Sequence, residues 1–130
     1  MMNRHERRKQ KKNLKKSSVV SQDLIKGIQF HTNKKYKEAE ILYKKVLSSD
    51  PNNYDAIRHL GILNQDLQNF EGAFKLFIKA VKVNPKGFEA LNNLGTIHLR
   101  NKNYDLAIKC LNKSLEIKNN YVPSINNLAG

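Results

Sequence analysis

The sequence repeats with a constant period of about 34 residues, marked by Gly27, Gly61 and Gly95. Further columns keep the same register: Tyr36, Phe70 and Tyr104; Ala39, Ala73 and Ala107; Tyr43, Phe77 and Leu111; Pro51 and Pro85. A fixed period of this length is typical of repeat architectures, in which each unit covers the apolar face of the next. The period therefore indicates the class of architecture before any chemistry is considered.

Each unit contains two stretches of helical periodicity. In the second unit, apolar residues recur at spacings of three and four over 57–63 and again over 73–81. Gln68 and Asn69 separate the two stretches, and residues 84–87 separate this unit from the next. Each unit is therefore predicted to be a helical hairpin. We expect helices near residues 20–33, 36–49, 54–67, 70–83, 88–101, 104–118, and from 122 to the end.

The recurring small residues have a packing role. Two helices approach to about 8–10 Å only where the side chains at the contact are small. Gly61 and Ala73 are expected to allow this approach in the second unit. Phe70, Phe77 and Leu60 then fill the space around the contact, and the remaining apolar face requires a neighbouring hairpin.

Over roughly residues 20–130 the chain resembles the tetratricopeptide repeat family. The residues that carry the resemblance are Leu60, Gly61, Phe70, Ala73, Phe77, Ala80 and Pro85. Lys26, Ser114 and Asn119 depart from the pattern in the other units. The resemblance implies an all-α solenoid of helical hairpins, wound as a right-handed superhelix. Its repeats are expected at 20–53, 54–87 and 88–121, followed by a truncated fourth at 122–130.

The resemblance also implies a function, the binding of a peptide or partner protein in a concave groove. The first helix of each repeat would line that groove. Helical spacing places twelve candidate partner-binding residues on the matching stripes. They are Asp55, Arg58, His59, Ile62, Asp66, Glu89, Asn92, Asn93, Thr96, Arg100, Asn126 and Asn127.

Two of the asparagines, Asn93 and Asn127, occupy the same place in successive repeats. An asparagine amide both donates and accepts, so it can pair with the backbone of an extended peptide. This arrangement resembles the asparagine ladder of O-linked N-acetylglucosamine transferases and related bacterial proteins. His59 and Ile25 interrupt the ladder in the earlier repeats. The alternative is that these asparagines are ordinary solvated residues of an asparagine-rich chain.

A second specialised resemblance, to the carboxylate clamp of chaperone-binding repeats, is not favoured. The clamp needs lysine, arginine and asparagine where this chain has Leu24, Ile28, His59 and Glu89. Glu89 would repel a bound carboxylate. We therefore do not expect the C-terminal tails of chaperones as ligands.

No catalytic constellation is visible, so we do not expect an enzyme within these residues. The sequence has no glycine-rich phosphate loop and no histidine pair at metal spacing. Cys110 stands alone, and neither a metal nor a cofactor is expected.

Leu128 stands one full period after Leu94, so a fourth repeat has begun where the sequence stops. This truncated repeat predicts that the chain is an N-terminal fragment of a longer protein. The alternative function is therefore the substrate-recognition arm of a glycosyl-, sulfo- or methyltransferase with its catalytic domain downstream.

The N-terminal segment 1–19 is predicted to be a disordered basic leader. Residues 1–18 hold eight basic residues and one glutamate, which gives +7 of the net charge of +13. The basic residues are Arg4, Arg7, Arg8, Lys9, Lys11, Lys12, Lys15 and Lys16. With almost no apolar residue the segment should be disordered or transiently helical. We do not expect nucleic acid as a partner. A second alternative function is nevertheless weak binding of nucleic acid or an anionic surface through this segment, against a merely solubilising leader.

The expected compartment is the cytoplasm. No apolar run approaches the roughly 18 residues that a membrane span needs. The basic segment leads into Ser17 and Ser18 rather than into the apolar core of a secretory signal. The single cysteine also fits a reducing interior.

Overall fold

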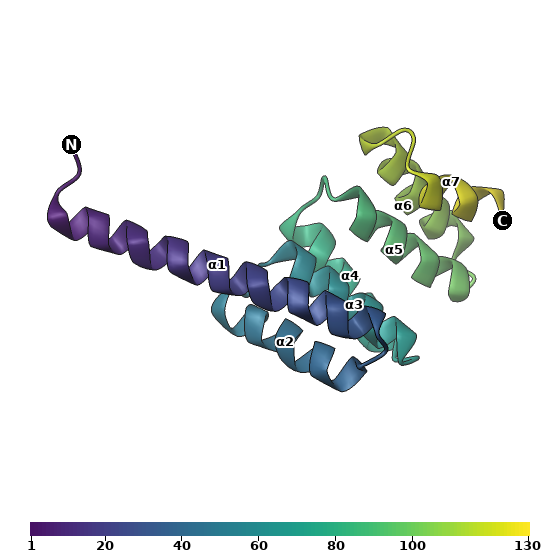
Figure 1. Ribbon diagram of the computed structural model, residues 1–130. Helices are drawn as coiled ribbons and strands as arrows, with labels where there is room; N and C mark the ends of the chain where they lie inside the picture. The colour runs from purple at the N-terminus through teal and green to yellow at the C-terminus, as the bar shows by residue number, and fades with distance from the viewer. The chain divides into compact units, whose positions relative to one another are not determined.

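The computed structural model describes residues 1–130, apart from the side chain of Lys16. It is built from seven α-helices and no strand (Figure 1), so the predicted all-α hairpin fold is confirmed. The helices are α1 (Arg4–Thr32), α2 (Tyr36–Ser49), α3 (Tyr54–Asp66), α4 (Phe70–Val83), α5 (Phe88–Arg100), α6 (Tyr104–Ile117) and α7 (Val122–Ala129). They form two compact units, Met1–Pro51 with α1 and α2, and Asn52–Gly130 with α3 to α7.

The turn inside each hairpin has the same geometry three times over. Lys34, Gln68 and Lys102 adopt left-handed φ values of 61°, 65° and 62°, and each stands one repeat period from the next. In each turn the N–H of the following residue donates back over five residues, as from Asn69 to the carbonyl of Asn64 at 2.7 Å. This bond closes the carboxyl end of the first helix and lets the chain reverse.

The repeat glycines permit the close approach of the paired helices. A Cβ atom on Gly61 would lie 2.6 Å from the ring of Phe77, which is completely buried. The corresponding distances are 2.8 Å between Gly27 and the ring of Tyr43, and 2.8 Å between Gly95 and a methyl group of Leu111. The predicted role of Gly61 is therefore confirmed.

The core of the second unit joins consecutive hairpins. Its buried members are Ala73 and Phe77 of α4 with Leu94 and Ile97 of α5. Partly buried side chains surround them: Ile62, Phe70, Phe74, Ile78, Val81 and Cys110. Burial raises the pKa of the Cys110 thiol, so this side chain packs as a protonated, apolar group.

The N-terminus differs from the expected disordered leader, because α1 begins at Arg4 rather than near residue 20. The N-cap Asn3 accepts from the backbone N–H of Glu6 at 2.8 Å, and the Glu6 carboxylate accepts from the N–H of Asn3 at 3.2 Å. No glycine or proline occurs before Gly27 to stop the helix. Like charges four residues apart oppose it by about 0.2–0.5 kcal/mol per pair. The side chain of Lys16 lies outside the described residues.

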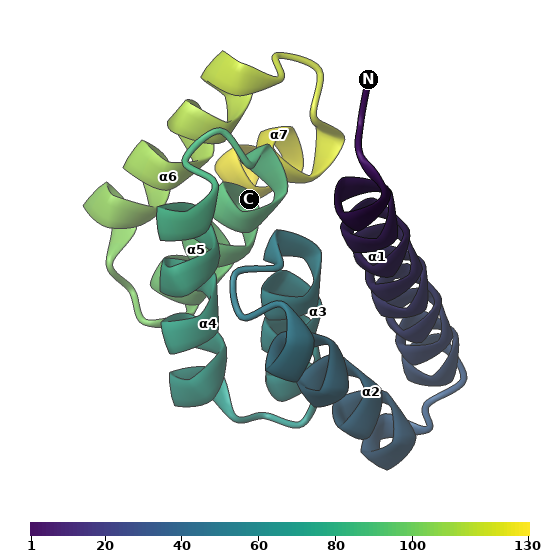
Figure 2. The same ribbon diagram turned by 90° about the vertical axis from the view of Figure 1, so that its left-hand side faces the viewer.

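In the first unit, α2 packs along the carboxyl half of α1. Lys45 forms an ion pair with Asp23 at 3.4 Å, and Nδ1 of His31 lies 3.2 Å from the hydroxyl of Tyr43. The amino half of α1 extends beyond α2, as the purple helix in Figures 1 and 2 shows. Among the described residues no helix has the length and apolar character needed to cross a bilayer.

Candidate protein-interaction surface

The twelve predicted partner-binding residues all lie on the first helices of the hairpins in the second unit. On α3 and α5 most of them form one stripe with spacings of four, three and four residues. These stripes are Asp55, His59, Ile62 and Asp66 on α3, and Glu89, Asn93, Thr96 and Arg100 on α5. Arg58, Asn92 and Asn126 lie one residue to the side, and Asn127 continues the stripe on α7. We call the exposed face of these three helices the first-helix surface.

Tyr54 connects the start of α3 to the start of α5. Its hydroxyl accepts from the backbone N–H of Ala90 at 3.1 Å and lies 3.3 Å from the Glu89 carboxylate, to which it donates. The N-cap residue of α5 is Gly87, which has no side chain to cap the helix. A Cβ atom at Gly87 would overlap the phenol of Tyr54. The glycine therefore lets a side chain from the preceding repeat cap α5.

The starts of the first helices share one electrostatic environment. Burial raises the pKa of Tyr54 to about 12; the bond from Ala90 lowers it and the charge of Glu89 raises it. Burial also raises the pKa of Tyr121; the charge of Arg58 lowers this pKa and the charge of Glu89 raises it. The ring of Tyr121 packs edge-on against Phe88 with centroids 4.8 Å apart. Arg58 and Glu89 are thus held beside two neutral phenols.

Alkaline pH is expected to weaken this end of the second unit. The folded pKa of Tyr54, about 12, exceeds the ordinary value of 10.0. The folded state therefore holds the phenolic proton more tightly, and its stabilising effect is complete below pH 10 and lost as pH rises towards 12. Thermal unfolding followed by circular dichroism between pH 9 and pH 12, roughly the window of this shift, should show the loss. The variant Tyr54→Phe should fall less steeply, and an equal fall in both would contradict the assignment.

Two polar atoms next to the first-helix surface have no hydrogen-bond partner among the described residues. They are Nε of Arg58 and Oδ1 of Asn93, and both are buried. The Nη2 atom of Arg58 donates towards Nε2 of His59 at 3.4 Å, so this guanidinium is only partly satisfied. Buried polar atoms in folded proteins are nearly always paired. Nδ1 of His98, also on α5, is a third buried atom without a partner among the described residues. The atoms of Arg58 and Asn93 are the ones that belong to predicted partner-binding residues.

Asn92, one of the predicted partner-binding residues, packs within the second unit. Its side chain is buried, with 6% exposed, and Oδ1 accepts from Ser124 at 3.0 Å and from the amide of Asn127 at 2.8 Å. Ser124 also lies 2.9 Å from the hydroxyl of Ser114, which donates to the carbonyl of Phe88. This network joins α5, α6 and α7. The amide of Asn127, one of the two expected ladder asparagines, is therefore engaged within the chain.

The sequence carries a signal for this network that the repeat pattern alone did not single out. Ser114 and Ser124 are both completely buried. In the preceding repeat, the equivalent places hold Ala80 and Ala90, which are also completely buried. Two serines thus replace two alanines at matching positions. The contact between Ser114 and Ser124 could therefore have been predicted from the sequence.

Arg100 is held by an aromatic ring at the far end of the stripe on α5. Its guanidinium carbon lies 3.5 Å from the centroid of the Phe70 ring at the start of α4. Thr96 donates to the backbone carbonyl of Asn93 at 2.6 Å. Glu89 also accepts from Tyr54, so three of the four side chains of the stripe on α5 are occupied, while the side-chain oxygen of Asn93 remains unpaired among the described residues.

Family models and solved structures identify the repeat. Two models of the tetratricopeptide repeat match, over residues 30–53 and 88–121. Among curated proteins none matches this sequence. The first TPR domain of Spaghetti (RPAP3), bound to the HSP90 peptide SRMEEVD, has a TM-score of 0.79 and 24% identity over 85% of this chain and 87% of that chain.

Two further structures have the same fold. The Sgt2 TPR domain from Aspergillus fumigatus has a TM-score of 0.79 and 22% identity over 85% of this chain and 75% of that chain. A mutant O-GlcNAc transferase from Thermobaculum terrenum has a TM-score of 0.77 and 21% identity over 93% of this chain. The matched region is 21% of the transferase chain.

Proposed function

We propose that this chain, which belongs to the tetratricopeptide repeat family, is a protein-interaction module that binds an extended segment of a partner protein along its first-helix surface. The observation that carries the proposal is Asn93. It lies in the middle of the stripe on α5, and its amide oxygen has no partner among the described residues. Rotating this side chain towards a ligand breaks no described hydrogen bond, and the amide can then pair with a peptide backbone.

The charges of the surface favour a basic segment. Asp55 and Asp66 on α3 and Glu89 on α5 are acidic, and the first two are exposed. Arg100 is stacked on Phe70, and Arg58 has a buried Nε atom. Opposite charges steer association and select partners. We therefore expect lysine- or arginine-containing peptides to bind better than peptides that end in a cluster of carboxylates.

The proposal is tested by selecting peptides of about 12 residues, long enough to follow several repeats, from a random displayed library. Binding of a selected peptide is then measured by fluorescence polarisation. Asn93→Ala should weaken binding about tenfold, the effect of losing roughly 1.4 kcal/mol. The matched control is Asn112→Ala, an exposed asparagine on the second helix α6, which should change binding less than about twofold. Equal effects of the two substitutions would refute the assignment to the first helices.

The heptapeptide SRMEEVD is a suitable acidic probe because it is the ligand in a related structure. Here it should bind more weakly than a selected basic peptide, because the carboxylate of Glu89 on the first-helix surface would repel the carboxylates of the probe. The variant Glu89→Gln should reduce the difference. Tighter binding of SRMEEVD than of every selected basic peptide would contradict the charge argument.

The alternative proposal, a substrate-recognition arm of a transferase, draws on the pair Asn93 and Asn127. The amide of Asn127 donates to Asn92 at 2.8 Å, so only Asn93 is available for a ladder. A general peptide-binding role needs no ladder and is therefore the one we favour.

A further inference from the structure

The amino half of α1 is an unusually basic helical arm. From Arg4 to Lys15 it carries seven basic side chains and one acidic one, and every residue in this range is exposed. The single acidic residue, Glu6, is bonded to the backbone N–H of Asn3 in the capping box. We call residues 4–15 the basic arm.

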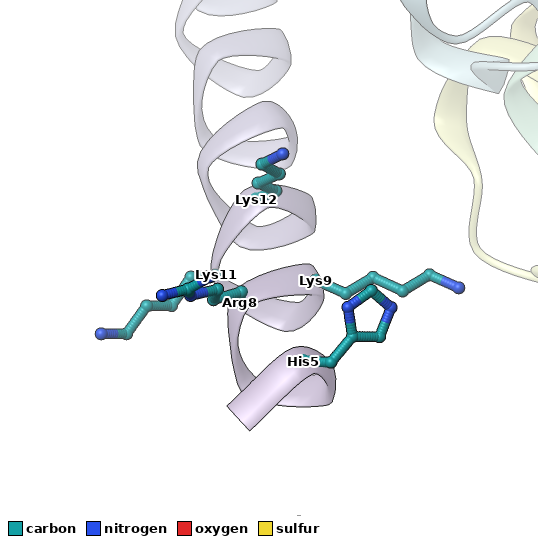
Figure 3. Close-up of a pocket in the computed structure, with 5 residues that line it drawn as sticks. All are labelled: His5, Arg8, Lys9, Lys11 and Lys12. Carbon is teal, nitrogen blue, oxygen red and sulfur yellow. The ribbon is translucent and has the colours of Figure 1, made fainter. Parts of the chain in front are cut away.

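The basic side chains are ordered around the helix. With about 100° per residue, Arg4, Arg8, Lys11 and Lys15 form one stripe within roughly 60°. Arg7 lies about 70° to one side of the stripe and Lys12 about 70° to the other. Figure 3 shows Arg8 and Lys11 leaving α1 on one side, with Lys9 and His5 on the other. The positive charge therefore spans a wide arc rather than a narrow line.

The opposite face of the arm carries no apolar surface. It presents Gln10 and Asn13, and Leu14 is the only large apolar side chain between Arg4 and Ser18. A helix that lies in a membrane interface needs a continuous apolar face. The arm also has no aromatic ring on which single-stranded bases could stack. The first observation argues against a membrane surface as the ligand. The second argues against single-stranded nucleic acid. A ligand that presents phosphates on two sides fits the wide arc of positive charge better.

We propose that the basic arm binds the phosphate backbone of duplex DNA by lying in the major groove. The groove is about 12 Å wide and an α-helix with side chains about 10–12 Å across, so the helix fits between the two strands. The central stripe then points into the groove, from which its long side chains reach phosphates at either edge, and the flanking cations Arg7 and Lys12 face the strands on either side. Twelve residues span about 18 Å, or roughly five base pairs.

This function is separate from peptide binding, because the arm and the first-helix surface of residues 52–130 share no residue. DNA binding would also offset a repulsion that the arm's own sequence builds in. Arg4, Arg8 and Lys12 are spaced by four residues, and so are Arg7, Lys11 and Lys15. Such like-charge neighbours repel within the helix, and DNA phosphates would relieve the repulsion.

The test is fluorescence anisotropy of the full chain with a labelled DNA duplex of about 20 base pairs, longer than the arm. If about five phosphates are neutralised, the logarithm of the affinity should fall with the logarithm of salt concentration with a slope of about −4 to −5. The variant Arg4→Gln, Arg8→Gln, Lys11→Gln, Lys15→Gln should lose at least about tenfold in affinity at 50 mM salt and have a much shallower slope.

The matched control removes four exposed lysines of the second unit and gives the same net charge: Lys79→Gln, Lys82→Gln, Lys109→Gln, Lys113→Gln. It should lose less than about threefold in affinity. Equal loss in the two variants would overturn the proposal, because binding would then follow net charge alone. Circular dichroism of both variants verifies that the helices are retained.

Two single variants test the groove placement. Arg7→Gln and Lys12→Gln should weaken binding to a similar degree, about two- to threefold each, because each faces a different strand. Weakening by only one of them would overturn the placement. The competing ligands are single-stranded RNA of equal length and anionic vesicles made from two parts phosphatidylcholine and one part phosphatidylserine. Tighter binding of either would overturn duplex DNA as the ligand.

Discussion

Alanine in place of Gly61 is expected to lower the free energy of unfolding of residues 52–130 by about 1–3 kcal/mol. In an exposed helix the same change would stabilise by about 1 kcal/mol, because alanine has the higher helix propensity. Here the added Cβ would lie 2.6 Å from the ring of Phe77. That ring is completely buried and cannot move aside without disturbing the core it shares with Leu94 and Ile97. Urea unfolding followed by circular dichroism measures the change.

The third repeat offers a comparison for Gly61. Gly95 faces Leu111, whose methyl group would lie 2.8 Å from an added Cβ. A leucine end is easier to displace than a ring, so Gly95→Ala should destabilise less than Gly61→Ala. The variant Phe77→Leu should also reduce the effect of Gly61→Ala measured in its background. If Gly61→Ala were neutral or stabilising, the close approach would not be what fixes glycine at this place.

The substitution Asn92→Ala is expected to lower the free energy of unfolding by about 1–3 kcal/mol. It removes the acceptor that Ser124 and Asn127 share. The Asn127 amide then has no acceptor beside a buried site, and Ser124 keeps only the hydroxyl of Ser114. Asn126 holds the same position one repeat later but is exposed. Asn126→Ala is therefore the matched control, with an expected change within about 0.5 kcal/mol. Thermal unfolding of the three proteins under one buffer condition makes the comparison.

A second variant separates the hydrogen-bond network from simple loss of volume. The triple variant Asn92→Leu, Ser114→Ala, Ser124→Ala replaces three polar side chains of the network by apolar groups. Such a replacement can be nearly neutral, whereas removing one partner leaves buried donors unpaired. The triple variant should therefore be more stable than Asn92→Ala. If Asn92→Ala and Asn126→Ala had equal effects, the network would contribute nothing measurable to the packing of α7.

The basic arm shows where reasoning from composition was insufficient. A high charge and few apolar residues predict disorder, but these are averages over the whole segment. The capping box of Asn3 and Glu6 is a local signal, and no glycine or proline between Glu6 and Gly27 interrupts the helix. The arm is continuous with a helical segment that packs on α2. A helix already nucleated by packing extends more easily than one that must start alone.

The repeat, the pairing of helices and the residues at the closest contacts can all be predicted from the amino-acid sequence. These follow from local rules: a constant repeat period, helical spacing, and small residues wherever two helices approach. The same rules identified the first helices as the source of candidate partner-binding residues.

Which of those residues remain available depends on how the repeats pack against one another. Asn92 and Asn93 are adjacent in sequence, yet Asn92 is occupied by α7 and Asn93 retains an oxygen without a partner among the described residues. Likewise, Tyr54 caps α5 only because Gly87 has no side chain in the way. Such outcomes depend on hydrogen bonds between residues 32 to 36 positions apart. A repeat pattern fixes where these side chains lie on their own helix, but their partners are set when neighbouring repeats pack together.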